Sequence, residues 1–121
     1  MKQAVFGAAL ALLSFAATAA FAGKQDFELV NKTGYDISHV YVSPTKSNDW
    51  EEDVLGKDIL EDGDSWDIEF ERGEKTCKWD LKVVYADDDS SAYWRNIDLC
   101  SVRKITIKYN RKSDTTSATF N

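Results

Sequence analysis

The sequence predicts an all-β fold, either a single antiparallel β-sandwich or a small barrel of about seven strands, on three observations. Short segments in which apolar and polar residues alternate recur from residue 26 onward, and this alternation is typical of half-buried strands. Turn-forming Gly, Pro, Asn, Asp and Ser residues separate the segments at close intervals. Apolar residues with helical spacing never extend beyond two turns after residue 22, so we expect one short helix, in the loop after the second strand.

The first 22 residues are expected to be a cleaved secretory signal. Lys2 is followed by an apolar run at residues 4–17, and Ala20-Phe21-Ala22 fits the small-x-small cleavage pattern. The run of about 14 residues is shorter than the roughly 20 that a transmembrane helix needs, so a retained membrane anchor is the less favoured alternative. Cleavage before Gly23 would leave one domain, residues 23–121, in the periplasm or outside the cell.

The mature protein is expected to be acidic. The full chain has 15 Lys and Arg against 21 Asp and Glu. Removal of residues 1–22 takes away Lys2 and no acid, which leaves 99 residues with a formal net charge of −7. Because a negative field repels phosphate backbones and anionic headgroups, we expect neither nucleic acid nor a membrane surface as a partner. Basic proteins and metal cations are the favoured partners.

The first two strands are expected at residues 26–31 and 36–43. Gly34 lies between them and tolerates the positive φ of a tight turn. The second strand is rich in aromatic and β-branched residues. Pro44 ends it, because proline has no N–H to give to a strand ladder.

A short helix is expected within residues 48–56. Asp49 can cap its N-terminus, and Glu52 lies three residues later, as a capping box requires. Trp50 and Val54 would then share one helical face.

Two strands with clean alternation are expected at residues 65–70 and 76–85, as antiparallel neighbours joined by a turn at Gly73. The residues expected to point inward are Trp66, Ile68 and Phe70 in the first strand and Cys77, Trp79, Leu81, Val83 and Tyr85 in the second.

The remaining strands are expected at residues 92–99, 102–109 and 115–120. In the first of them, Tyr93 has the parity of the apolar residues and Trp94 that of the polar ones. Cys100 also has the parity of the polar residues. A bulge or a strand end just before it is therefore expected to direct its sulfur toward Cys77.

Cys77 and Cys100 are the two cysteines of the chain, and in an exported protein they indicate one disulfide bond. Their separation excludes a C-x-x-C redox motif, which favours a structural role. A loop of this size is worth about 3 kcal/mol of stability in the chain-entropy model.

Several short motifs resemble a group of small exported bacterial β proteins of unknown function. They are Tyr41-Val42-Ser43-Pro44, Asp49-Trp50, Asp53-Val54-Leu55-Gly56, Leu60 with Gly63, Cys77-x-x-Asp80 and Asp98-Leu99-Cys100. The resemblance covers nearly all of the mature chain and implies an exported β domain with paired cysteines. Some members carry an argininosuccinate lyase label, but a chain this short could not form the large helical oligomer of that enzyme.

Acidic residues between positions 87 and 98 partly match a calcium-binding loop. Asp87, Asp89 and Asp98 fall at positions 1, 3 and 12 of the template, although position 6 lacks the required glycine. These three are the candidate metal ligands, and the alternative is a solvated turn.

The sequence offers little catalytic chemistry. The single histidine, His39, lies within a predicted strand, and no nucleophile elbow accompanies it. Carboxylate pairs could hydrolyse glycosides, but one of them needs an apolar pocket that a domain of this size rarely has room for. We therefore expect neither enzymatic activity nor a cofactor.

An acidic segment, residues 49–71, is the strongest candidate binding surface. It contains eleven acids and, as its one base, Lys57. Trp50 and Trp94 are expected to be exposed as anchors for a partner, or else to cover an open end of the sandwich. The candidate partner-binding residues are Asp49, Trp50, Glu51, Glu52, Asp53, Asp62, Asp64 and Trp94. The basic residues of 102–121 are expected to neutralise this segment, within the fold or on a second copy, or to lie on a different face.

These observations favour an exported, non-enzymatic interaction domain, in its most specific form an inhibitor or immunity-type protein that binds a basic envelope-directed enzyme. One alternative is a calcium- or glycan-binding envelope module that uses Asp87, Asp89 and Trp94. The other is a structural protein without a small-molecule ligand.

Overall fold

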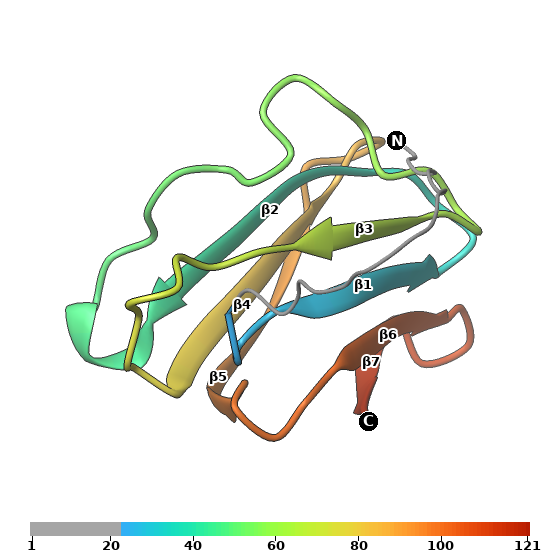
Figure 1. Ribbon diagram of the computed structural model, residues 1–121. Coiled ribbons are helices and arrows are strands. Elements are labelled where there is room, and N and C mark those ends of the chain that lie inside the picture. The colour runs from blue at the N-terminus through green and yellow to red at the C-terminus, as the bar shows by residue number, and fades with distance from the viewer. Residues whose placement is uncertain (1–22) are drawn as a thin grey trace, which may run out of the picture.

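The computed structural model describes residues 23–121, which form two packed β-sheets (Figure 1). The seven strands are β1 (Phe27–Lys32), β2 (Ile37–Pro44), β3 (Ser65–Ile68), β4 (Lys78–Tyr85), β5 (Ser91–Asp98), β6 (Lys104–Asn110) and β7 (Thr115–Phe120). One sheet has the order β3-β1-β6-β7 and the other β2-β4-β5. The predicted all-β sandwich is confirmed. The predicted signal sequence, residues 1–22, lies outside the described residues.

Strand pairing differs from the prediction in two respects. β1 lies between β3, to which it is antiparallel, and β6, to which it is parallel. The predicted pairing of residues 65–70 with 76–85 is wrong, because β3 pairs with β1 while β4 lies between β2 and β5 in the other sheet. The N–H of Phe70 donates to the carboxylate of Asp26 over 2.8 Å, just after β3 ends, and the chain then crosses between the sheets.

The two sheets enclose one hydrophobic core. Its fully buried members include Leu29, Ile105 and Ile107 from one sheet and Val40, Leu81 and Val83 from the other. Each such side chain contributes about 1.5–3 kcal/mol when it leaves water. The inward face predicted for β4 is confirmed, since Trp79 and Tyr85 are buried as well.

The helical prediction at residues 48–56 is wrong. The one helical element among residues 23–121 is a 3-10 turn, Thr45–Ser47, in the loop after β2. The predicted segment instead follows the edge of β2, where the N–H of Val54 donates to the carbonyl of Val40 over 2.8 Å. In a helix, the N–H of Val54 would donate to a carbonyl of the same helix, but here it donates to β2. Asp49 therefore caps no helix. No helical segment of residues 23–121 is long and apolar enough to cross a membrane.

A bulge in β5 reverses two of the predicted side-chain orientations. The register between β4 and β5 shifts near Asn96, whose φ is 61°. Before the bulge, Trp94 packs against the core, and Tyr93 is 57% exposed. The predicted orientations of Tyr93 and Trp94 are wrong, because the alternation does not continue through the bulge to Ile97.

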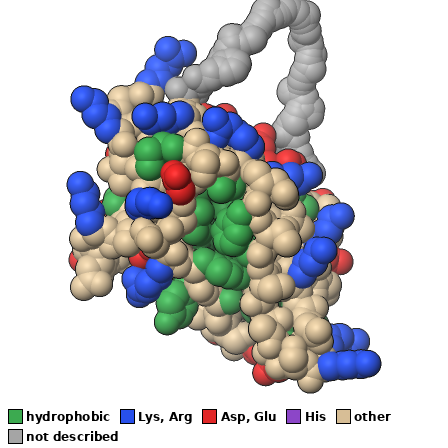
Figure 2. Space-filling model, turned by 90° about the horizontal axis from the view of Figure 1, so that it is seen from below, with side chains coloured by type: hydrophobic (Ala, Val, Ile, Leu, Met, Phe, Trp, Pro, Cys, Tyr) green, Lys and Arg blue, Asp and Glu red, His purple; other side chains and the backbone are tan. Residues whose placement is uncertain are grey.

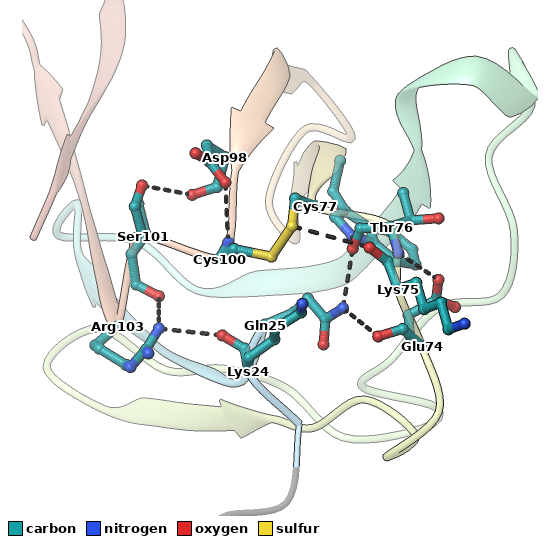
Figure 3. The surroundings of a disulfide bond; sticks show 12 residues. Lys24, Gln25, Glu74, Lys75, Thr76, Cys77, Asp98, Cys100, Ser101 and Arg103 are labelled. Carbon is teal, nitrogen blue, oxygen red and sulfur yellow. Dashed lines mark hydrogen bonds between the residues drawn. A yellow bond between two sulfur atoms is a disulfide. The ribbon is translucent and has the colours of Figure 1, made fainter.

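Cys77 and Cys100 form the predicted disulfide, with their Cα atoms 5.2 Å apart (Figure 3). β5 ends at Asp98, so the predicted strand end before Cys100 is present. The N–H of Leu99 donates to the carbonyl of Cys77 over 2.9 Å. The disulfide thus closes the open end of the β4–β5 hairpin within one sheet, and it fits an oxidising environment.

Candidate functional site

The predicted acidic segment forms most of the connection between β2 and β3. This connection runs along the upper side of the molecule in Figure 1, away from β6 and β7 at the lower side. The side chains of Asp49, Glu51 and Glu52 are exposed, and they form no ion pair with any residue between 23 and 121. These three carboxylates are therefore free to meet a cationic partner.

Asp53 has a structural position within the same segment. Its Oδ1 accepts hydrogen bonds from the N–H groups of Val40 and Leu55, over 2.9 and 3.0 Å. Its Oδ2 lies 2.7 Å from Nδ1 of His39. These contacts attach the connection to the edge of β2.

Two further predicted residues also hold the connection in place. Asp62 accepts a hydrogen bond of 2.8 Å from the N–H of Gly34, in the turn between β1 and β2. Asp64 is half-buried, and its carbonyl accepts the N–H of Asn31 over 2.9 Å. The predicted partner-binding acids therefore divide into an exposed group near Trp50 and a group that fixes the loop.

Trp50 lies against the outer face of the β2-β4-β5 sheet, within a cluster of aromatic and cationic side chains. We call Tyr41, Trp50, Lys82, Tyr93 and Arg95 the Trp50 surface. Lys82 lies over Tyr41 and Trp50, with 5.8 and 5.9 Å from its Nζ to the ring centroids. Arg95 lies 5.2 Å from Tyr93 and 6.0 Å from Trp50. The rings of Trp50 and Tyr93 meet edge to face at 6.5 Å.

Asp80 was not among the predicted site residues, but it lies buried beneath this surface and holds part of it in place. It is 3% exposed, and its Oδ1 accepts from the hydroxyl of Thr45 over 2.7 Å and the N–H of Asn96 over 2.9 Å. Its Oδ2 accepts from Nη1 of Arg95 over 2.9 Å. Asp80 thereby holds the β5 bulge and the guanidinium that lies beside Trp50. In the sequence, Asp80 has the outward parity of Lys78 and Lys82, so the alternation did not mark it as a buried residue.

The other predicted site residues do not come together. Trp94 packs against the core and does not join the Trp50 surface, where Tyr93 takes the expected place. Asp87 and Asp89 lie in the β4–β5 turn, whereas Asp98 lies at the far end of β5, opposite Lys78. The length of the strand separates them, so these three carboxylates cannot share one calcium ion.

One group of three metal-ligating side chains converges among residues 23–121: Cys77, Asp98 and Cys100. Both sulfurs belong to the disulfide, and Oδ1 of Asp98 accepts the N–H of Cys100 over 3.1 Å (Figure 3). The group is therefore part of the disulfide loop and is not suited to a metal ion.

The C-terminal basic residues lie away from the acidic connection. Arg103, Lys104, Lys108, Arg111 and Lys112 are exposed on or beside β6. Figure 2 views the molecule from this lower side, where an apolar patch lies between uncharged groups and Lys and Arg side chains project around the outer edge of the view. These bases therefore do not cover the exposed carboxylates of Asp49, Glu51 and Glu52, which we call the acidic border of the Trp50 surface.

Comparisons of the chain with family models, with curated proteins and with solved structures found no match. The resemblance to small exported bacterial proteins accordingly stays a prediction.

Proposed function

We propose that this protein is an exported, non-enzymatic interaction domain that binds a basic protein through the Trp50 surface and its acidic border. The observation that carries the proposal is that Trp50, between Asp49 and Glu51, lies beside Tyr93 and Arg95 on one face. Trp, Tyr and Arg are the side chains most enriched among residues that dominate binding energy at protein interfaces.

The charge arrangement supports a cationic partner. Lys82 and Arg95 are already paired with rings, and Arg95 is also paired with Asp80. The exposed carboxylates of Asp49, Glu51 and Glu52 are left for the lysines and arginines of a partner. Such complementary charge steers association and weakens as salt is added.

The most specific form of the proposal is an inhibitor or immunity-type protein that blocks a basic enzyme acting on the cell envelope. Small size, the disulfide and the acidic charge support it. A glycan-binding role is less well supported, because Lys82 and Arg95 lie close to the Trp50 ring on which a sugar would stack.

The experiment is affinity capture from a periplasmic extract, with retained proteins identified by mass spectrometry. The test variant carries Asp49→Lys, Glu51→Lys and Glu52→Lys, and leaves Asp53 intact because it holds the loop. A matched control reverses three other exposed acids, Asp67, Glu69 and Glu71.

We expect a basic exported protein that binds the wild type and the control variant alike. The test variant should bind it at least about tenfold more weakly, and added salt should weaken the wild-type complex. Trp50→Ala should weaken binding by about thirtyfold if Trp50 is the anchor. Equal retention of every captured protein by the test and control variants would overturn the proposal.

A further inference from the structure

A second candidate site lies at the end of the sandwich where the β1–β2, β4–β5 and β6–β7 turns meet. An open cavity of about 220 Å³ is lined there by three tyrosines, three aspartates and one serine: Tyr35, Tyr85, Tyr109, Asp87, Asp88, Asp114 and Ser90. We call it the tyrosine pocket. It lies at the end of β4 that carries Tyr85, whereas Asp80 lies near the other end of this strand. The tyrosine pocket is therefore distinct from the Trp50 surface.

The three rings form a cluster in which each pair meets edge to face. Their centroids are 6.2 Å apart for Tyr35 and Tyr85, 5.5 Å for Tyr35 and Tyr109, and 6.1 Å for Tyr85 and Tyr109. The planes of the rings make angles of 67–83° with one another, so the rings line the cavity in different orientations. Electron-rich aromatic walls of this kind attract cations.

Hydrogen bonds fix two of these rings. The hydroxyl of Tyr109 donates to Oδ1 of Asp114 over 2.5 Å, and the hydroxyl of Tyr85 is bonded to that of Thr116 over 2.8 Å. The walls are therefore in position before a ligand arrives, which reduces the entropic cost of binding.

The aspartates give the pocket a negative charge that the chain itself does not neutralise. The four cation–π contacts among residues 23–121 all involve Tyr41, Trp50 or Tyr93. The ion pairs of these residues do not include Asp87, Asp88 or Asp114. Within residues 23–121, therefore, no lysine or arginine pairs with the rings or carboxylates that a cationic ligand would contact.

The spacing of the carboxylates favours a diffuse cation over a metal ion. Within residues 23–121, the one group of three acidic, His or Cys ligand atoms that comes within 4.8 Å lies at the disulfide. The pocket acids are too dispersed to coordinate calcium at its usual distances of about 2.3–2.6 Å. The volume also lies below the range of roughly 300–1,000 Å³ that holds a drug-sized molecule, which leaves a small head group as the fitting ligand.

We propose that the tyrosine pocket binds a small organic ammonium ion. The three rings contact its positively charged nitrogen and the carbon atoms bound to that nitrogen, and the aspartates supply the opposite charge. The same chemistry exists in a free quaternary ammonium compound and in the lysine side chain of a protein.

The experiment is an NMR titration of the tyrosine ring signals of the purified, disulfide-bonded protein with four probes. Choline represents a quaternary ammonium compound, and n-butylammonium represents a lysine side chain. The uncharged 3,3-dimethylbutan-1-ol has nearly the shape of choline and tests the need for charge. Calcium chloride tests for a metal site.

We expect choline or n-butylammonium to shift the signals of all three tyrosines, with the neutral alcohol at least about tenfold weaker. The tighter of the two cations identifies the source of the natural ligand. The double variant Asp87→Asn and Asp88→Asn should weaken cation binding about fivefold while the rings stay in place. Asp89→Asn is the matched control, because Asp89 lies in the same turn but does not line the pocket.

Four outcomes would overturn the proposal. The neutral alcohol could bind as well as choline, calcium alone could shift the tyrosine signals, or no probe could shift them. A fourth is equal weakening by the double variant and by Asp89→Asn. Circular dichroism of each variant checks that a lost signal does not come from unfolding.

Discussion

Aspartate side chains hold several backbone segments that are far apart in the sequence. Asp26 accepts the N–H of Phe70, Asp53 that of Val40, and Asp80 that of Asn96. Hydrogen bonds between a charged group and a neutral one are typically worth about 1.5–3 kcal/mol. Part of the acidic composition therefore stabilises the fold, and only the remainder is available to partners.

Gly23 occupies a position with no room for a larger residue. Its N–H donates to Oδ2 of Asp26 over 3.0 Å, and an added Cβ would lie 2.7 Å from Oδ1 of Asp26 and 3.0 Å from the carbonyl of Phe70. We predict that Gly23→Ala lowers the free energy of unfolding by about 1–2 kcal/mol. Gly73→Ala is the control, since nothing lies within 4 Å of its added Cβ. Urea unfolding measures both, and equal stability of the two variants would contradict the prediction.

The hydroxyl of Tyr109 is held in its neutral form by its acceptor. The hydrogen bond to Asp114, assisted by desolvation, raises the pKa of Tyr109 to about 12. Because the folded-state pKa exceeds the ordinary value near 10, the resulting stabilisation is present below pH 10 and is lost as the pH rises toward 12.

We predict that Asp114→Asn lowers the pKa of Tyr109 toward 10, because a neutral amide is a weaker acceptor and adds no negative charge. Asparagine also tolerates the positive φ of 54° at this position. Spectrophotometric titration of tyrosinate measures the shift. Asp89→Asn, which also has a positive φ, should leave the titration unchanged.

At the scale of single elements, the β5 bulge determines which aromatic side chains reach the outer face. Asp80 binds the N–H of Asn96 at the bulge and the guanidinium of Arg95 next to it. Since side chains alternate along a strand, one extra residue exchanges the two faces and places Tyr93 outside.

We predict that Asp80→Asn destabilises the protein by about 3 kcal/mol, because an amide cannot accept from all three donors at once. Asp67→Asn, an exposed change on β3, should stay within about 0.5 kcal/mol of the wild type. Urea midpoints measure both, and hydrogen exchange at Asn96 should accelerate in Asp80→Asn alone. An unchanged exchange rate would show that another contact holds the bulge.

The failed helix prediction shows how a strand edge overrides a local signal. Asp49 and Glu52 have the spacing of a capping box, which is worth on the order of 1 kcal/mol. The edge of β2 offers hydrogen bonds to Val54 and to the carboxylate of Asp53, and the apolar side chain of Leu55 becomes buried. These tertiary contacts together exceed the local preference.

At the scale of the whole molecule, the disulfide stabilises the fold by reducing the conformational entropy of the unfolded chain. It does not link the two sheets, because it closes one hairpin within a single sheet. It connects the residue before β4 with a residue just after β5, across a separation of 23 residues. We predict that reduction, or Cys77→Ser with Cys100→Ser, lowers the free energy of unfolding by about 3 kcal/mol. Urea unfolding with and without reductant measures this, and coincident midpoints would contradict the prediction.

The strand content could be predicted because alternation is a local property, and the inward face of β4 followed from it directly. The order of the strands could not, since the pairing of β1 with β3 and β6 depends on residues distant in sequence. For the candidate site, the sequence pointed to Trp50 and its acidic neighbours. It missed Asp80 and exchanged Trp94 for Tyr93, because the irregularity in this strand was expected just before Cys100, whereas the register shifts earlier, near Asn96.

The position of β1 has a consequence for the order in which the protein can fold. One edge of β1 pairs with β6, which begins at Lys104, so this edge stays open until the last part of the chain is available. A chain that is translocated from its N-terminus would expose an unpaired strand edge throughout its passage, and such edges readily pair with other chains. A holding chaperone that shields extended segments would then raise the yield of native protein.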